Sequence, residues 1–539
     1  MGKKLLCLIM ALCCVLGLVA CGEKEIPADK ASTDSTLHGG FIAETKDYVY
    51  FINGVESYTT DYKTGKVTKG ALLRVKKSEF ASVVDGKEAT NPNYETVVSK
   101  LIVSDDMNAG VYIYGDYVYY AVPSTENDRT GNVKRDQLNF FRTKLDATET
   151  SKKNIAGRDF AHGATFRYIQ SAGTVYLVVY STELYVYNAD TGEQVYTTEA
   201  GEDADPTAKI DVAEVMFGKD SVYFTSLPVN KLLSNKDNVQ KHAYHVVYEI
   251  DFAGKKAVEV INGAGTTKVN GETNPNGFGL LGVTIDLLRV ADGALYFSYS
   301  SLNTVSSSTP VYVKVAESKL TAKYATTWHT ELESTTLTVT TPKTANIFAD
   351  TSIYHGGKIY YVDSSVGLVS YDPTASYEDT NFGVSTVYYS ETIKGATLDY
   401  VNNEGGVDYL YFHSSGNYYK VKLDGSDEEF RINVHAVDTD WYKPEVVKVG
   451  EKYYFVAAYS SEDFKSYVYA IDMAAVKAAY DAWDASEDED KPEDFYAVEE
   501  DEDAEDLAFD VFAKRNNVLG SVTEADIKGI ESTSESVKA

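Results

Sequence analysis

A short tyrosine-rich strand pattern recurs eight times between residues 41 and 475, and this repetition constrains the fold more than any other feature. Each copy begins with a Gly or Asp turn and continues with alternating aromatic and β-branched residues. Such alternation, bounded by turn residues, is typical of β-strands. The eight copies occupy residues 47–51, 116–120, 173–177, 220–224, 293–297, 357–361, 408–412 and 450–455.

A second strand follows the first in nearly every copy, so that one unit consists of a strand, a turn, a strand and a variable loop. The second strands include residues 72–75, 140–146, 184–188, 246–251, 311–315, 418–425 and 467–472. One such hairpin cannot bury its own faces, and repetition at this scale is typical of propellers and solenoids. The helices that most solenoids require are missing. We therefore predict an all-β fold with a single β-propeller of about eight blades, or seven if one hairpin is misread.

The repeats also resemble a known family. The Gly/Asp-x-Val-Tyr-Phe strands and the Leu423-Asp424-Gly425 turn resemble the tyrosine-rich, propeller-like repeats of surface lipoproteins in Gram-positive bacteria, which are repeats of unknown function. The resemblance covers residues 41–475. It implies a fold and a location outside the cytoplasm, and it implies no activity.

The first twenty residues have the pattern of a secretory signal peptide. Lys3 and Lys4 precede an apolar stretch over residues 5–20, which is shorter than the roughly 20 residues that span a bilayer. The segment Leu18-Val19-Ala20-Cys21 resembles the lipobox of bacterial lipoproteins. That resemblance implies a diacylglycerol on the sulfur of Cys21 and cleavage before it. The alternative is an uncleaved anchor helix, which would also leave the body outside.

Cysteine usage agrees with export and lipid attachment. The four cysteines are residues 7, 13, 14 and 21, so a chain cleaved before Cys21 has no thiol left for a disulfide. Residues 21–40 are small and polar, and we predict that they form a lipidated, flexible tether. Two acyl chains anchor a protein stably. We therefore expect the protein on the extracytoplasmic side of the cell membrane.

The net charge argues against nucleic-acid binding. The chain carries a formal charge of −31, which becomes −33 when the leader with Lys3 and Lys4 is removed. This charge repels phosphate backbones. We expect a soluble, monomeric body on its lipid anchor.

The composition changes after residue 472, and we predict an acidic, partly helical or disordered tail over residues 476–539. Residues 481–510 contain sixteen Asp or Glu and a single Lys, which is typical of self-repelling segments. Apolar residues at helical spacing predict short helices near both ends of this block. They are Met473, Val476, Tyr480 and Trp483 around its start, and Leu507, Val511 and Phe512 around its end, with Ser521 and Glu524 as a capping box further on.

Metal-ligand patterns are weak in this sequence. Of the eight histidines only His242 and His245 are close, and three residues apart on a strand they point to opposite faces. Oxygen ligands for calcium crowd one turn. These residues are Asp424, Asp427, Glu428 and Glu429, although they lack the spacing of a calcium loop and also fit a solvated hairpin tip. We predict no cofactor, with a structural calcium ion at Asp424, Asp427 and Glu429 as the alternative.

No catalytic motif stands out either. The segment Gly277-Phe278-Gly279-Leu280-Leu281-Gly282 has GxGxxG spacing, but it follows a turn and not the strand that a dinucleotide site requires. No Gly-x-Ser-x-Gly elbow and no phosphate-binding loop occur. We therefore expect no catalytic residue, and a binding or scaffold module whose loops at one propeller face hold a peptide, glycan or partner protein. The alternatives are a carbohydrate-active enzyme with a pocket at the propeller centre and an envelope-assembly factor.

Overall fold

The computed structural model describes most of the repeat region and parts of both flanking segments. It describes residues 27–29, 38–52, 63–64, 67–68, 70–78, 95–103, 110–124, 129–130, 137–199, 210–227, 232–235, 238–241, 244–264, 282–301, 310–331, 336–337, 347–349, 351–375, 381–432, 441–460, 466–487, 495–496 and 518–521. Cys21, the leader, His242 and most of the GxGxxG segment lie outside the described residues.

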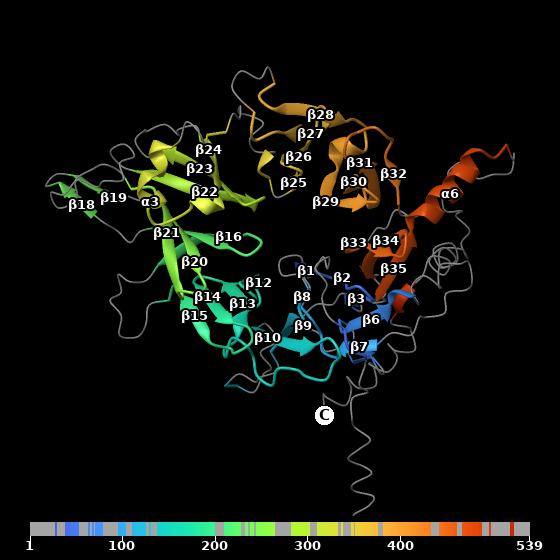
Figure 1. Ribbon diagram of the computed structural model, residues 1–539, viewed down its shortest axis with the longest axis horizontal. Helices are drawn as coiled ribbons and strands as arrows, with labels where there is room; N and C mark the ends of the chain where they lie inside the picture. The colour runs from blue at the N-terminus through green and yellow to red at the C-terminus, as the bar shows by residue number, and fades with distance from the viewer. Residues whose placement is uncertain are drawn as a thin grey trace, which may run out of the picture.

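Eight antiparallel sheets surround a common axis and form a β-propeller, with the first strand of each sheet nearest the centre (Figure 1). We number these sheets blades 1 to 8 in chain order. Blade 1 contains β2 (Ile42–Glu44), β3 (Tyr48–Ile52), β6 (Leu72–Lys76) and β7 (Glu95–Val98). Blade 2 contains β8 (Val111–Tyr114), β9 (Tyr117–Pro123), β10 (Gln137–Lys144) and β11 (Phe160–Ala161). Blade 3 contains β12 (Thr165–Ser171), β13 (Thr174–Tyr180), β14 (Leu184–Asn188) and β15 (Gln194–Thr197).

The next blades repeat this order. Blade 4 contains β16 (Asp211–Phe217), β17 (Val222–Leu227), β20 (Val246–Asp251) and β21 (Lys256–Asn262). Blade 5 contains β22 (Val283–Ala291), β23 (Ala294–Ser301) and β24 (Val311–Ala316), followed by η2 (Glu317–Lys319), α3 (Tyr324–Thr327) and η3 (Trp328–Thr330). Blade 6 contains β25 (Ile353–His355), β26 (Lys358–Asp363), β27 (Gly367–Tyr371) and β28 (Val384–Tyr388), followed by η4 (Ile393–Gly395).

The last two blades carry the C-terminal helix. Blade 7 contains β29 (Thr397–Glu404), β30 (Val407–Ser414), β31 (Asn417–Lys422) and β32 (Phe430–Arg431). Blade 8 contains β33 (Trp441–Val449), β34 (Lys452–Ser460), β35 (Ser466–Asp472) and β36 (Val518–Ser521), and α6 (Met473–Asp484) follows β35 directly. Two small hairpins lie in the connections. They are β4 (Lys63–Thr64) with β5 (Val67–Thr68), and β18 (Leu232–Asn235) with β19 (Asn238–Lys241).

The predicted all-β propeller with eight blades is therefore confirmed. Each tyrosine-rich pattern in the sequence marks the second strand of one blade, and the strand that follows it in the pattern is the third. The prediction missed the innermost and outermost strands. The innermost strands, such as β29, carry polar residues close to the axis, and these interrupt the alternating pattern. Among the outermost strands, β11 and β32 are only two residues long, which is too short for a pattern to be seen.

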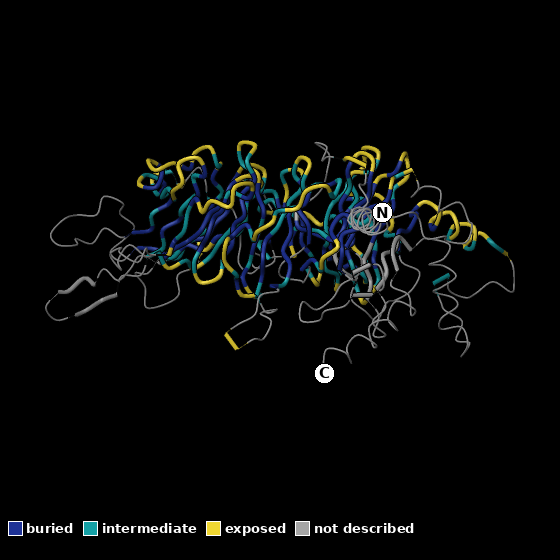
Figure 2. The backbone as a smooth tube through the Cα atoms, turned by 90° about the horizontal axis from the view of Figure 1, so that it is seen from below, coloured by how far each residue is buried: buried dark blue, intermediate teal, exposed yellow. Residues whose placement is uncertain are grey.

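Apolar side chains between neighbouring blades form the core. Seven clusters of buried residues fill the eight interfaces between neighbouring blades, because one cluster spans both interfaces of blade 1. One cluster joins Val447, Val449 and Tyr454 of blade 8 to Val49 and Phe51 of blade 1. The ring is therefore closed by hydrophobic packing between its first and last blades. Seen edge-on, buried backbone lies in the middle of the disc and exposed turns lie along its edges (Figure 2).

Tight turns join the first and second strands of the blades. In blade 7, Gly405 and Gly406 connect β29 to β30 with φ angles of 63° and 92°. Positive φ at both central positions is the geometry of a type I′ hairpin, which glycine adopts without strain. All blades have the same strand order around the axis, so these turns lie on one face of the disc together with the turns between third and fourth strands. We call this the turn face.

Two strands of the propeller lie outside the predicted body of residues 41–475. β1 (His38–Gly40) pairs with β8 at the centre, and β36 is the outermost strand of blade 8. Parts of the predicted tether and tail therefore each add a strand to a blade. The physical reason is that an edge strand has unpaired backbone groups, which gain hydrogen bonds when another strand pairs with them. Ser521, the predicted helix cap, is the last residue of β36. Within the described residues, no helix is long and apolar enough to cross a membrane.

Candidate functional site

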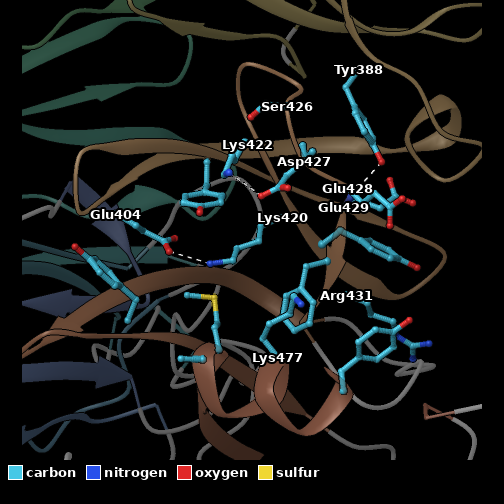
Figure 3. A pocket seen from close by; sticks show the side chains of 18 of the residues that line it. Tyr388, Glu404, Lys420, Lys422, Ser426, Asp427, Glu428, Glu429, Arg431 and Lys477 are labelled. Carbon is cyan, nitrogen blue, oxygen red and sulfur yellow. Dashed lines mark hydrogen bonds and ion pairs between the residues drawn. The ribbon is translucent and has the colours of Figure 1, made fainter. Parts of the chain in front are cut away.

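The structure contains a large open cavity of about 1110 Å³ at the outer edge of the disc, between blade 7 and α6. Its walls come from β31, β32, the turn between them, the first turns of blades 7 and 8, and one face of α6 (Figure 3). We call it the rim pocket. The sequence predicts a ligand site in the loops of one propeller face, with the propeller centre as the alternative, and the turns that line this pocket lie on one face of the disc.

An ion pair forms one wall of the rim pocket. Lys420 Nζ lies 2.9 Å from Glu404 Oε2, and only 8% of the Glu404 side chain is exposed. Tyr411 donates its hydroxyl to Glu404, and the lysine ammonium lies 4.4 Å from the centre of the Tyr409 ring. Burial is the largest reason why the pKa of Tyr411 lies well above its usual value, so this phenol keeps its proton and remains a donor.

The turn that carries the calcium candidates forms a second wall. Asp427 pairs with Lys422 at 2.7 Å, and Ser426 N donates to Asp424 Oδ1 at 2.9 Å. Glu429 accepts from Ser390 Oγ at 2.6 Å, and its own backbone N donates to the Tyr388 hydroxyl at 3.1 Å. Each candidate ligand therefore has a different protein partner. Among the described residues, no group of three histidine, cysteine or carboxylate side chains is arranged to hold a metal ion.

Helix α6 forms a third wall, and its first turn is well defined. The Asp472 side chain accepts from the backbone N of Ala474 and Ala475, both at 3.1 Å, which satisfies two of the free donors at the helix start. Lys452 pairs with the other carboxylate oxygen at 3.0 Å. The helix turns Met473 and Val476 inward and places Lys477 and Tyr480 at the pocket. The predicted apolar stripe is therefore confirmed at Met473 and Val476, which are the buried residues of the helix.

Tyr496, from the acidic block, completes the pocket, and its neighbour Phe495 packs on Tyr480. Tyr496 donates its hydroxyl to the Arg431 carbonyl at 3.1 Å, and the Arg431 guanidinium lies 4.4 Å from the Tyr496 ring centre. Tyr496 stacks with Tyr480 at a centroid distance of 5.9 Å, and Phe495 meets Tyr480 edge-on at 5.5 Å. These contacts hold residues 495–496 against blade 7 and α6.

The pocket combines aromatic rings with an equal number of basic and acidic groups. Its basic residues are Lys420, Lys422, Arg431, Lys452 and Lys477, and its acidic residues are Glu404, Asp427, Glu428, Glu429 and Glu451. Aromatic faces offer apolar contact, whereas planar carboxylate and guanidinium groups offer hydrogen bonds in fixed directions. Figure 3 shows Lys420 directed toward Glu404 and Lys422 toward Asp427.

Sequence patterns could have indicated part of this site. Lys420 and Lys422 alternate with apolar residues on a strand and therefore share one face. Phe495 and Tyr496 form an isolated aromatic pair inside the acidic block, which is a reason to expect a docking point there. Glu404 and Lys477 give no such signal, because their proximity depends on how blade 7 meets α6.

Two His–Asp pairs bear on whether the chain has a catalytic site. His355 Nε2 lies 2.8 Å from Asp408 Oδ2, and His413 Nδ1 lies 2.8 Å from Asp399 Oδ1. Burial raises the pKa of Asp399, and the hydrogen bond to Asp399 raises the pKa of His413. Among the described residues, no serine, threonine or cysteine side chain hydrogen-bonds to either imidazole, so neither pair forms the triad that activates a nucleophile.

Comparison with known proteins adds solved structures only. No family model matches the chain, and no curated sequence matches it. A prolyl endopeptidase is similar over 74% of this chain and 50% of its own, at 10% identity and a TM-score of 0.38, so this chain spans half of that protein. BamB from Moraxella catarrhalis is similar over 83% and 98% of the two chains, at 9% identity and a TM-score of 0.32. The polysaccharide lyase Uly1 is similar over 83% and 92%, at 11% identity and a TM-score of 0.30. These proteins differ from one another in function.

Proposed function

We propose that this chain is a membrane-anchored extracytoplasmic lipoprotein that binds a glycan in the rim pocket without cleaving it. The observation that carries the proposal is the composition of the pocket walls, in which tyrosine rings alternate with ion-paired side chains. A sugar ring has an apolar C–H face that packs on an aromatic ring, and its hydroxyls both donate and accept. A wall of balanced charge and aromatic area matches that ligand better than it matches a purely anionic or purely apolar one.

The state of two pocket carboxylates, Glu404 and Asp427, favours binding over hydrolysis. Cleavage of a glycosidic bond needs one carboxylic acid that donates a proton and a second carboxylate on the other side of the bond. Glu404 accepts from Lys420 and Tyr411, and Asp427 pairs with Lys422. Carboxylates engaged in this way serve to position side chains and ligand hydroxyls.

Calorimetric titration of the chain without its leader, residues 22–539, with soluble cell-wall polysaccharide fragments tests the binding proposal. Lys477→Ala removes a pocket side chain whose ion pair with Asp481 is exposed, and we expect it to weaken binding about five- to tenfold. Lys255→Ala on blade 4 is a matched control, because it breaks an equally exposed pair with Glu193 of blade 3. Equal affinity of both variants would place the ligand elsewhere, and the release of shortened glycan would show an enzyme.

The membrane anchor has its own test. Mass spectrometry of the full chain purified from bacterial membranes should show a diacylglycerol on Cys21 and no residue before it. Cys21→Ala should leave the leader in place and abolish the lipid. A wild-type chain that begins at Met1 and carries no lipid would contradict this part of the proposal.

A further inference from the structure

A segment close to the predicted lipidation site is held against the propeller. Thr45 Oγ1 and the Tyr50 hydroxyl both donate to Asp29 Oδ2, at 2.6 and 2.7 Å. The Arg74 guanidinium donates to the carbonyl of Pro27. Residues 27–29 are therefore bound to blade 1, although they lie within the stretch that the sequence predicts as a flexible tether.

Arg74 explains why this segment docks at this place. Its side chain is fully buried, and it donates to Glu95 Oε2 at 2.8 Å and to the Leu145 carbonyl at 3.0 Å. Its guanidinium also lies 4.0 Å from the centre of the Tyr48 ring. A buried guanidinium needs a partner for each of its donors. The Pro27 carbonyl supplies one of them, so the docked segment completes the environment of a buried charge.

The docking point lies on the turn face of the disc. Thr45 belongs to the turn between the first and second strands of blade 1, and Leu145 directly follows β10, the third strand of blade 2. The rim pocket is on the same face, because Glu404 and Glu451 belong to the first turns of blades 7 and 8. Blade 8 is also the direct neighbour of blade 1.

Pro27 comes only six positions after Cys21 in the sequence. Six residues span at most about 20 to 22 Å when fully extended. We infer that the docked segment holds the turn face, and with it the rim pocket, toward the lipid surface to which Cys21 is anchored. This inference rests on the proposed lipid at Cys21, and its partner is the bilayer surface itself. A ligand of the rim pocket would then be bound close to the membrane.

Fluorescence quenching on vesicles tests this orientation without depending on natural lipidation. In the chain of residues 21–539, Cys21 is the only thiol and can be coupled to a maleimide lipid in phosphatidylcholine vesicles that contain a headgroup quencher. Fluorescent reporters are attached through azide-bearing residues, which are introduced at exposed positions on both faces of two blades. They replace Thr191 and Thr182 on blade 3, and Thr374 and Ser365 on blade 6, where the first of each pair lies on the turn face.

We expect at least twofold stronger quenching at Thr191 than at Thr182, and at Thr374 than at Ser365. Equal quenching within each pair would overturn the inference, and this is also the result that a disc standing on edge would give. Asp29→Ala removes the hydrogen bonds from Thr45 and Tyr50 and should reduce the contrast between faces, while an unchanged melting temperature confirms the fold. A natural chain without lipid would contradict the proposed function and leave this geometric result intact.

Discussion

At the scale of single residues, Glu249 is the side chain whose charge state should control stability near neutral pH. Burial, followed by repulsion from Glu317, Asp251 and Asp220, raises the pKa of Glu249 from 4.5 to about 7. Because the folded-state pKa is raised, the protonated acid is favoured by folding. The contribution of Glu249 is fully present below pH 4.5 and is lost as the pH rises through about 7.

Glu249→Gln should therefore stabilise the protein at pH 8 by about 1 to 2 kcal/mol, a figure already reduced because much of the carboxyl is solvated. The same substitution should have little effect at pH 4.5. Urea unfolding between pH 4.5 and 8 measures the difference. Glu193→Gln, at an exposed carboxylate on blade 3, serves as a control, and a pH profile unchanged by Glu249→Gln would refute the assignment.

Two buried tyrosines should respond in opposite ways to loss of their hydroxyl groups. The Tyr120 hydroxyl shares a 2.8 Å hydrogen bond with Thr143, whereas the buried Tyr361 hydroxyl has no hydrogen-bond partner among the described residues. Tyr120→Phe should cost about 1 kcal/mol, and Tyr361→Phe should be neutral or stabilising. Thermal unfolding of both variants makes the comparison. A cost for Tyr361→Phe equal to that for Tyr120→Phe would indicate that a water molecule serves as the missing partner.

At the scale of elements, helix α6 depends on its cap and in turn forms a wall of the rim pocket. Asp472→Ala removes both capping hydrogen bonds and should cost about 1 to 2 kcal/mol. It should also weaken ligand binding, because Lys477 and Tyr480 lose their fixed position. Asp472→Asn retains the capping oxygen and loses only the ion pair with Lys452. If Asp472→Asn is as unstable as Asp472→Ala, the ion pair and not the cap fixes the helix.

The elements also show how much of this molecule could be predicted from sequence. The second strands, such as β13, were predictable because turn residues and alternating aromatic side chains reflect burial between two blades. The inner strand β29 was not, because residues such as Asp399 and Asn402 interrupt the alternation. The rim pocket was not predictable as a site. Its walls bring together Glu404, Lys420 and Lys477, which lie on three different elements.

At the scale of the whole molecule, the ring is closed by side-chain packing between blades 8 and 1, and each of these blades draws its strands from its own part of the chain. A closed ring has no free end, so its first and last blades should be as stable as the others. An open array would fray at its terminal blades, because each unit there has only one neighbour. Hydrogen exchange followed by mass spectrometry separates these cases through protection in β3, β17 and β34.

We expect similar protection for these three strands in the wild-type chain. Val447→Asp places a carboxylate at a buried position of the closure cluster and should cost about 3 to 5 kcal/mol. Because the closure opens first, protection should fall in β3 and β34 well before it falls in β17. Lys448→Asp introduces the same carboxylate at the exposed neighbouring position and should leave all three strands protected. Uniform loss of protection in Val447→Asp would instead mean that the eight blades unfold as one unit, with no step at which the ring is merely open.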